Sequence, residues 1–418
     1  MRLIVTSEHR FSIAADGTVW SRVTNDYPFF QRYLVAFDTV KVVARAKSDS
    51  LIDGTYKQVT GPGVEFWPVP FYLGPRAFAL RRREIASSVL AALDGKDAVL
   101  CRVASPIATE LLRQIKGRPY GLEVVGDPHE ALGPGAVRHP LRPLFRRLMS
   151  RNLEKQCGHA AGVAYVTQTT LQKRYPCPAH SVGVSDVSHL DFTGSPKVFT
   201  TSYSSVTWKE DDFAAEARRF QNCQNSRVLF VGSLAQKYKG ADVLLRAVAR
   251  LQSKSVMEVI MVGDGKHRRE LENLAATLGI AGRVKFLGEL PSGRAVREQM
   301  DRATLFVMPS RTEGLPRAMI EAMARALPCI GTRVGGIPEL LDDDDLVGAG
   351  DVEALAEKMR EVLSSSERLT EMSARNLKRA QEYRPEVLEG RRSGFYRFLR
   401  RVTEEWAAQN HPATAVTA

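Results

Sequence analysis

The C-terminal half of the chain alternates short apolar runs with amphipathic stretches, and this alternation restricts the folds available to it. Strands are expected at residues 227–231, 256–262, 284–287, 304–308 and 328–331. Helices are expected after the first four of them, at 241–251, 266–278, 294–301 and 317–325. Continuous apolar strands separated by helices are typical of a parallel sheet that is covered on both faces. We therefore expect a doubly wound α/β domain in this half.

The N-terminal half repeats this rhythm less regularly. Strands are expected at 3–6, 40–44, 98–103, 122–125 and 162–166, and helices at 84–93, 107–115, 143–156 and 168–174. Residues 53–75 are rich in Gly, Pro and aromatic side chains, which predicts a loop region. A chain of 418 residues suits two domains. We expect them at 1–205 and 206–386, with a closing helix at about 387–410 that returns to the first domain.

Two doubly wound domains imply a cleft, because ligands of such sheets bind beyond the carboxyl ends of the strands. Glu313 and Glu321 follow the strand 304–308, and a Gly-x-Pro turn precedes a helix start between them. Free backbone N–H groups and the positive end of the helix dipole can bind a diphosphate there. A carboxylate inside the helix can accept hydrogen bonds from two neighbouring hydroxyl groups. The pattern predicts a site for a sugar, a diphosphate and a ribose in a row.

This string resembles the glutamate-x7-glutamate signature of the retaining glycosyltransferases of family four, and the similarity covers roughly 227–363. The resemblance implies an α/β protein of the GT-B fold, in which two Rossmann-like, doubly wound domains face a central cleft. It also implies that Glu313 contacts hydroxyls of the donor sugar as a catalytic residue and that Glu321 holds the ribose. Backbone groups that face the distal phosphate are then expected at Gly314, Leu315 and Arg317.

Three further turns of the C-terminal half complete the donor site that the resemblance implies. In the family, an arginine after a glycine and a lysine before a later glycine bind the donor diphosphate. Lys239 matches the lysine, whereas Ser233 stands at the arginine position. This departure either leaves one cation fewer or gives its role to Lys237. The turn at Gly263 is expected near the cleft, and the backbone at Leu287 resembles the stretch that reads the nucleotide base.

The N-terminal half offers weaker candidates. Gly17 lies in a turn that partly matches the family's loop over the donor phosphates, although the family usually has a glycine pair there. Asp127 and His129 follow the strand 122–125, where such enzymes present polar groups to the sugar and the acceptor. They are either catalytic residues or satisfied structural ones. His9, after the first strand, is a similar and weaker candidate.

The chain carries a net charge of +12, which fits an anionic lipid surface, phosphate-bearing substrates, nucleic acid or a generally solvated surface. No recognised nucleic-acid-binding motif is present, so we expect no nucleic-acid partner. Residues 141–156 interleave arginines with leucines. They form either a basic amphipathic helix that makes a peripheral membrane contact or an ordinary half-buried helix with a cationic outer face.

Other features concern location and metal content. The five cysteines are scattered without CxxC spacing, which predicts no disulfide, no zinc site and a reducing compartment. No run is apolar enough for a membrane-spanning helix, and the first residues are too short an apolar run for a signal peptide. We expect a cytoplasmic protein that can work at the inner face of the plasma membrane, without a metal.

The resemblance implies a metal-independent, retaining hexosyltransferase with no cofactor other than its nucleotide-diphosphate-sugar co-substrate. The acceptor would be a glycan, a lipid-linked molecule or a small molecule, in the synthesis of a cell-surface polysaccharide or glycoconjugate. Two alternatives remain. One is another GT-B enzyme, such as an epimerase, and the other is a non-catalytic nucleotide-sugar-binding protein, which the Ser233 departure keeps open.

Overall fold

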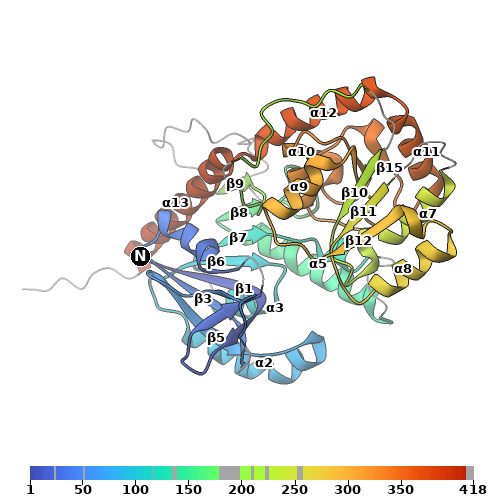
Figure 1. Cartoon of the computed structure of the whole chain (residues 1–418). Coiled ribbons are helices and arrows are strands. Elements are labelled where there is room, and N and C mark those ends of the chain that lie inside the picture. Colours follow the sequence, from blue (N-terminus) through green and yellow to red (C-terminus); the bar gives the residue numbers. More distant parts are fainter. Residues whose placement is uncertain are drawn as a thin grey trace, which may run out of the picture.

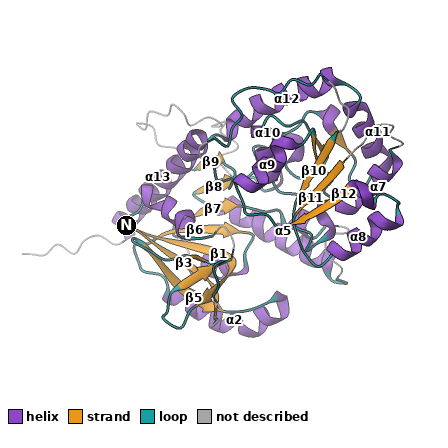
Figure 2. Ribbon diagram, in the orientation of Figure 1, coloured by secondary structure: helices purple, strands orange, loops and turns teal. Residues whose placement is uncertain are grey.

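The computed structural model describes residues 1–22, 25–49, 52–115, 117–133, 139–177, 198–208, 211–221, 226–251 and 258–410. Within these residues the chain forms two α/β halves, each built around its own sheet (Figure 1). Helices flank both sheets (Figure 2). In this part of the chain, no helix is long and apolar enough to cross a membrane.

The N-terminal sheet is largely parallel. Its described strands are β1 (Arg2–Ile13), β2 (Val19–Ser21), β3 (Thr39–Ser48), β4 (Lys57–Gln58), β5 (Val64–Pro70), β6 (Ala98–Val103), β7 (Gly121–Val124), β8 (Gly162–Tyr165) and β9 (Phe199–Ser202). They follow the order β4-β2-β1-β6-β7-β8-β9, and β3 pairs with β1 and β5. The pairings of β2 are antiparallel, and the others are parallel.

Helices cover both faces of this sheet. They are α1 (Tyr27–Gln31), α2 (Gly74–Ala91), α3 (Pro106–Gln114), α4 (Pro128–Ala131), α5 (Arg142–His159) and α6 (Thr170–Arg174). Ile4 and Val99 share a core with α2, α3 and α5. Leu3 and Val5 belong to a second core, which includes residues of α13 (Pro385–Asn410). Side chains alternate along a strand, so one strand supplies both cores.

Two expectations for this half are corrected by the structure. β1 extends well beyond the run at 3–6, to Ile13, because polar residues after Ser7 continue the strand through a shift in register. Residues 64–70 form β5 and not a loop. β5 pairs with β3 alone, and an edge strand tolerates Pro68 and Pro70 because their missing N–H groups face no partner strand.

The C-terminal half contains a six-stranded parallel sheet. Its strands are β10 (Arg227–Val231), β11 (Glu258–Val262), β12 (Val284–Gly288), β13 (Leu305–Met308), β14 (Cys329–Thr332) and β15 (Leu346–Val347), in the order β12-β11-β10-β13-β14-β15. Its helices are α7 (Ala241–Arg250), α8 (Arg268–Thr277), α9 (Arg294–Arg302), α10 (Arg317–Ala324), α11 (Val352–Leu363) and α12 (Ser366–Ala380). The strand order reverses between β10 and β13, which makes the loops after these two strands the expected ligand site.

The helix α13 carries the chain back to the N-terminal half, where it contacts β6, β8 and β9. Its Tyr396 hydroxyl donates a hydrogen bond of 3.0 Å to the buried Glu123 carboxylate, which also accepts one of 2.9 Å from Tyr203. Burial alone would raise the pKa of Glu123, but the guanidinium groups of Arg102 and Arg32 hold this pKa below its usual value. The cluster fixes α13 on the first half. The domain bounds stay a prediction.

Candidate active site

Two loops meet where the C-terminal strand order reverses, and Arg311 joins them. Its backbone N–H donates a hydrogen bond of 2.6 Å to the Tyr238 carbonyl oxygen in the loop after β10. Its guanidinium group binds the Asp242 carboxylate through two hydrogen bonds of 2.8 and 2.7 Å. Such two-pronged pairs fix orientation as well as distance. Arg311 therefore sets the position of the loop after β10 against the loop after β13.

This anchoring brings Lys239 and Glu313 together. The Lys239 ammonium group forms an ion pair with the Glu313 carboxylate, which also accepts a hydrogen bond of 3.1 Å from Ser310 Oγ. The side chain of Glu313 is only 8% exposed. Gly240, with φ of 71°, follows the lysine, and a Cβ atom there would lie 1.9 Å from the Pro309 carbonyl oxygen. Only glycine permits this approach of the two loops.

Glu313 lines a cavity of about 230 Å³ between the two halves. Lys239 and residues 313–317 form its C-terminal wall. Val125 and Val166, which follow β7 and β8, form the opposite wall, together with Ser204 and Ser205. The start of α10 thus faces an interdomain cleft, as the motif predicts, and its backbone N–H groups and dipole favour an anion there.

Glu321 lines an adjoining cavity of about 420 Å³. Arg317 and Ser205 line both cavities, so the two are neighbours. Burial raises the pKa of Glu321 to about 7, Arg317 opposes this shift, and Asp212 adds to it. The N-terminal half contributes further lining residues, among them Phe29 and Arg32. The cleft therefore continues from Glu313 past the start of α10 to Glu321.

A glycine-rich turn after β14 supports the Glu313 loop from behind. A Cβ atom on Gly335 (φ 53°) would lie 1.9 Å from the Glu313 carbonyl oxygen, and the Gly336 N–H donates to the Gly314 carbonyl at 2.6 Å. The same turn ends in Glu339, which reaches across to the N-terminal half.

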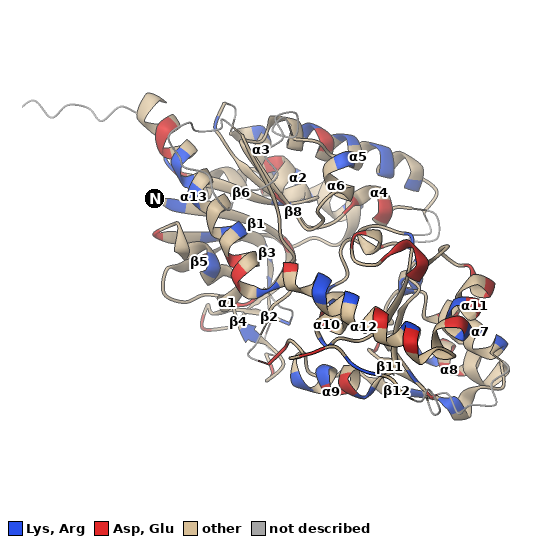
Figure 3. Cartoon of the chain, turned by 90° about the horizontal axis from the view of Figure 1, so that it is seen from above, with Lys and Arg blue, Asp and Glu red and all other residues tan. Residues whose placement is uncertain are grey.

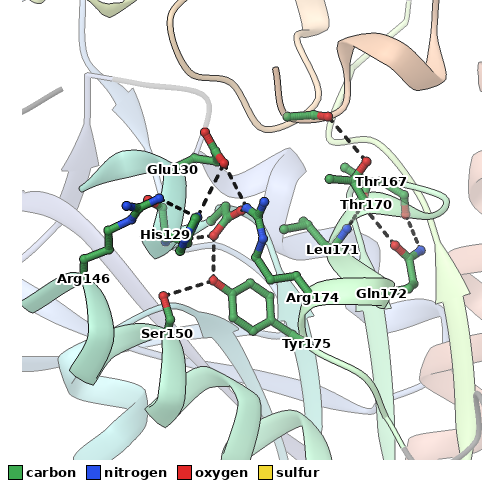
Figure 4. A network of polar contacts seen from close by, with 12 residues as sticks. His129, Glu130, Arg146, Ser150, Thr167, Thr170, Leu171, Gln172, Arg174 and Tyr175 are labelled. Atoms are coloured by element: carbon green, nitrogen blue, oxygen red, sulfur yellow. Dashed lines mark hydrogen bonds and ion pairs between the residues drawn. The ribbon is translucent and has the colours of Figure 1, made fainter. Parts of the chain in front are cut away.

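Glu339 connects the two halves directly. Its carboxylate accepts hydrogen bonds from the backbone N–H groups of Thr169, at 3.1 Å, and Thr170, at 2.6 Å, and one of 3.0 Å from Thr169 Oγ1. The Arg379 guanidinium group holds the Glu339 carbonyl oxygen at 3.0 Å. The Thr170 hydroxyl, labelled in Figure 4, donates a further hydrogen bond of 3.4 Å to the Gly335 carbonyl oxygen. We call the contact of the Glu339 carboxylate with Thr169 and Thr170 the Glu339 latch.

Two predicted donor residues after β10 lie apart from the cleft. The Lys237 ammonium group is exposed and pairs with Glu270, and its role in place of the missing arginine stays a prediction. Ser233 Oγ accepts a hydrogen bond of 3.2 Å from the Ala235 N–H. In the described part of the chain, neither residue lines the two cavities of the cleft.

Three other predicted positions also lie outside the two cavities among the described residues. Gly263 makes a tight turn, where a Cβ atom would lie 2.0 Å from the Gly232 carbonyl oxygen. The Leu287 side chain is 39% exposed. Gly17 (φ 82°) lies in the exposed turn between β1 and β2, where the sequence places a turn, and its contact with the donor phosphates stays a prediction.

Asp127 and His129 belong to a network outside the cleft (Figure 4). The buried Asp127 carboxylate accepts hydrogen bonds from the His129 N–H, at 2.8 Å, and the Tyr175 hydroxyl, at 2.6 Å, and it pairs with Arg174. The His129 ring nitrogen Nδ1 lies 3.0 Å from the Arg146 guanidinium group. Among the described residues, Asp127 and His129 do not line either cavity of the cleft. Contacts within the N-terminal half account for both side chains, and their catalytic role stays a prediction.

Sequence reasoning missed several residues of the cleft. Ser205, Phe29 and Arg32 lie in loops or short helices without any pattern, so no signal identifies them. His9 was a minor candidate. Partial desolvation and the charges of Arg102, Arg45 and Arg317 lower its pKa to about 4, so its imidazole is neutral at pH 7. Arg317 begins α10, which puts His9 within electrostatic reach of the cleft.

No group of three His, Cys, Asp or Glu side chains is arranged to hold a metal ion in the ranges that the structure describes. The anion-binding features of the cleft are Lys239, Arg317 and the start of α10. They favour a ligand that brings phosphate groups and hydroxyl groups.

Comparison with known proteins identifies a family for part of the chain. Residues 225–365 match the family described as glycosyl transferases group 1. Protein CapJ of Staphylococcus aureus is 24% identical over 389 residues, 91% of this chain and 92% of CapJ. The amylovoran biosynthesis glycosyltransferase AmsK of Erwinia amylovora is 34% identical over 143 residues, 32% of this chain and 35% of AmsK.

Solved structures extend the likeness to the whole fold. Sucrose-phosphate synthase from Thermosynechococcus elongatus superposes with a TM-score of 0.67 at 16% identity, over 98% of this chain and 100% of that one. HepE from Anabaena, in complex with UDP-glucose, superposes with a TM-score of 0.58 at 16% identity, over 98% and 100%. The chain therefore has the GT-B fold, and its residues 225–365 form a glycosyl transferases group 1 domain.

Proposed function

We propose that this protein is a retaining, metal-independent glycosyltransferase that uses a nucleotide-diphosphate sugar as donor. One observation carries the proposal: Glu313 and Glu321 line adjoining cavities of one interdomain cleft, with the start of α10 between them. A sugar, a diphosphate and a ribose fit that order. The group 1 match over residues 225–365 supports transferase chemistry, and HepE, which has this fold, binds UDP-glucose.

Each residue has a distinct task in this proposal. The backbone N–H groups at the start of α10 and the Lys239 ammonium group bind the diphosphate, and Glu321 accepts hydrogen bonds from the ribose hydroxyls. Lys239 pairs with Glu313 in the structure, and a diphosphate beside α10 offers the lysine a second anion. Glu313 then becomes available to hydroxyls of the donor sugar.

The reaction needs no protein nucleophile. The bond between the anomeric carbon and the diphosphate oxygen breaks, and the acceptor oxygen bonds to that carbon from the same face. The acceptor proton passes to the departing diphosphate. The charge that develops on the leaving group is stabilised by Lys239 and α10, and such prearranged stabilisation is usually the largest contribution to catalysis.

The acceptor belongs, in this proposal, to cell-surface polysaccharide or glycoconjugate synthesis. AmsK, which matches about a third of this chain, is named for the synthesis of amylovoran. The exposed leucines and arginines of α5 favour a lipid-linked acceptor at the inner face of the plasma membrane (Figure 3). Flotation with anionic vesicles tests the membrane contact, and protein that stays at the bottom of the gradient with every lipid mixture contradicts it.

A donor screen tests the activity. Uridine, guanosine and adenosine diphosphate sugars are each mixed with the protein and candidate acceptors, and nucleotide release and the anomeric configuration of the product are measured. We expect one donor to react with retention, without added metal and in the presence of a chelator. Conversion of the sugar without an acceptor indicates an epimerase, and tight donor binding without turnover indicates a binding protein. Either result overturns the proposal.

Glu321→Ala separates the site from the fold. We expect donor binding to weaken strongly while the melting temperature stays near that of the wild type, because the side chain faces the cleft. Normal donor binding by a folded Glu321→Ala variant contradicts the site assignment.

A further inference from the structure

A second cavity, of about 450 Å³, lies beside α5 and apart from the cleft. It shares none of the described lining residues with the cavities of Glu313 and Glu321. Four guanidinium groups line it, those of Arg146, Arg147, Arg151 and Arg174. Glu154 is the one carboxylate among the described lining residues, so the cavity has a net positive charge. We call it the arginine pocket.

Two of these arginines are fixed in place by the fold (Figure 4). Arg146 donates hydrogen bonds to the His129 carbonyl oxygen, at 2.8 Å, and lies 3.0 Å from His129 Nδ1. Arg174 pairs with Asp127 and, at 3.1 Å, with Glu130. The network that sequence reasoning assigned to catalysis thus holds two cations at the wall of the arginine pocket.

The other two arginines have no ion-pair or hydrogen-bond partner within the ranges that the structure describes. Arg147 and Arg151 are exposed, and a spacing of four residues puts them on the same side of α5. Ser150, whose Oγ lies 3.4 Å from the Tyr175 hydroxyl, lines the pocket between them. Two unpaired cations beside two fixed ones, with hydroxyl groups at hand, form an arrangement suited to phosphate oxygens.

Two exposed leucines of the same helix stand close in sequence to the lining arginines, and we call them the rim of the pocket. Leu144 and Leu148 are 50% and 53% exposed, and each precedes or follows an arginine of the lining by a few residues. A free phosphate ion would make no use of such leucines, whereas a phosphate on a lipid brings apolar chains next to its charge. The pocket and its rim therefore fit one amphiphile.

We propose that the arginine pocket binds the phosphate group of a lipid, and that the acceptor of this protein is a phosphate-bearing lipid-linked molecule. The first part stands on the pocket alone, and the second rests on the proposed glycosyl transfer. Arg147 and Arg151 contact the phosphate, while Arg146 and Arg174 supply positive potential from fixed positions. Leu144 and Leu148 contact the lipid chains.

Vesicle binding tests the pocket without any need for turnover. Phosphatidylcholine vesicles that contain phosphatidic acid, which exposes a terminal phosphate, are compared with vesicles that contain phosphatidylserine at the same surface charge. We expect preferential binding to phosphatidic acid, and Arg147→Gln/Arg151→Gln should weaken it by roughly tenfold to thirtyfold. Equal binding to both kinds of vesicle, or unchanged vesicle binding by the double variant, overturns the proposal that the arginine pocket binds a lipid phosphate.

A matched control removes the same charge elsewhere. Arg246 on α7 and Arg269 on α8 are exposed in the C-terminal half. Arg246→Gln/Arg269→Gln should change vesicle binding less than about twofold, because neither residue lines the arginine pocket. A loss equal to that of Arg147→Gln/Arg151→Gln reduces the effect to net charge and overturns the proposal. Glu154→Gln should strengthen binding, and weakened binding contradicts the assigned sign.

Competition identifies the source of the phosphate. Inorganic phosphate is added to protein bound to phosphatidic acid vesicles at constant ionic strength. We expect little release, because the ion lacks apolar chains. Full release at millimolar phosphate shows that the pocket prefers the free ion and overturns the lipid assignment. If the protein binds phosphatidic acid vesicles as expected but reacts with no donor in the screen, the proposed function is refuted and the lipid assignment of the arginine pocket still holds.

Discussion

The turn after β13 and the turn after β7 look alike in sequence but differ in what surrounds their carboxylates. Both follow the carboxyl end of a buried parallel strand, and both present an acid near the start of a helix. Glu313 pairs with one lysine from a neighbouring loop and lines a cavity. Asp127 is fully used by its own helix, by Arg174 and by Tyr175. Position at a strand end thus indicates where a ligand binds, and the partners of a side chain decide whether it can take part.

Neutralising the Glu313–Lys239 pair should have the largest effect and sharpen this contrast. For Glu313→Gln and for Lys239→Gln we expect kcat/KM for the donor to fall roughly 100-fold, the size expected when one prearranged charge is lost from the transition state. Steady-state kinetics measures it. Glu367→Gln, on an exposed part of α12, serves as the control. A fall of less than threefold in both pair variants removes the pair from the reaction.

Replacing Glu321 should act on binding and on its pH dependence. A carboxylate accepts the ribose hydrogen bonds, and its pKa of about 7 means that wild-type donor affinity falls as the pH drops through 7. Glu321→Gln should bind the donor about tenfold more weakly at pH 8 and show a flat pH profile. Calorimetric titration over about 2.5 pH units, from about pH 6 to about pH 8.5, measures the donor affinity and its pH dependence. If the donor affinity of the variant depends on pH as steeply as that of the wild type, the assignment of Glu321 is contradicted.

The same substitution should stabilise the fold at high pH. Burial raises the pKa of Glu321 above its unfolded value, so stability is complete below the unfolded pKa and is lost as the pH rises through about 7. Glu321→Gln should therefore raise the free energy of unfolding by about 1–3 kcal/mol at pH 8, and by little in acid. Denaturant unfolding at the two pH values checks this, and equal stability at both pH values is the contrary result.

Breaking the Glu339 latch should have an intermediate effect. Glu339→Ala removes the acceptor of the Thr169 and Thr170 N–H groups, while every donor-binding residue proposed here lies in the C-terminal half. We expect kcat to fall about tenfold through lost alignment, with the donor KM changed less than twofold. Glu339→Gln, which retains an acceptor oxygen, should restore part of the rate. A higher donor KM with unchanged kcat contradicts the prediction, because it means that Glu339 supports the donor site and not the alignment of the two halves.

Replacing Asp127 should change activity least. Asp127→Asn removes one of the two carboxylates that pair with Arg174, so the free energy of unfolding should fall by about 1–3 kcal/mol. With a water-soluble acceptor, kcat should stay within about threefold of the wild type. A fall comparable with that of Glu313→Gln would erase the difference between the two turns.

The sequence predicts the C-terminal half well because its inner strands, such as β11 and β13, are buried along nearly their whole length and so form continuous apolar runs. The run at 304–308 corresponds to β13 at Leu305–Met308, and 284–287 to β12 at Val284–Gly288. Within the candidate site, the motif correctly brings Glu313, the start of α10 and Glu321 to one cleft.

The sequence predicts the N-terminal half less well, and the reasons are physical. β5 contains two prolines that only an edge position permits, and polar residues extend β1 beyond its apolar start. A similar limit applies in the C-terminal half, where Lys237 and Lys239 are two residues apart. Lys237 forms an ion pair with Glu270 of α8, whereas Lys239 pairs with Glu313 in the cleft. Such pairings between distant segments leave no mark in local sequence, and the same holds for Asp127 and Arg174.

The Glu339 latch also bears on the timing of the reaction. Its carboxylate accepts hydrogen bonds from several donors of one short segment. Separating the halves leaves each of these donors without its partner until water replaces it, so the contact opposes opening of the cleft. In the proposed reaction, a product that needs a wider groove to leave would have to break this contact first, which adds a step to the turnover cycle apart from bond making.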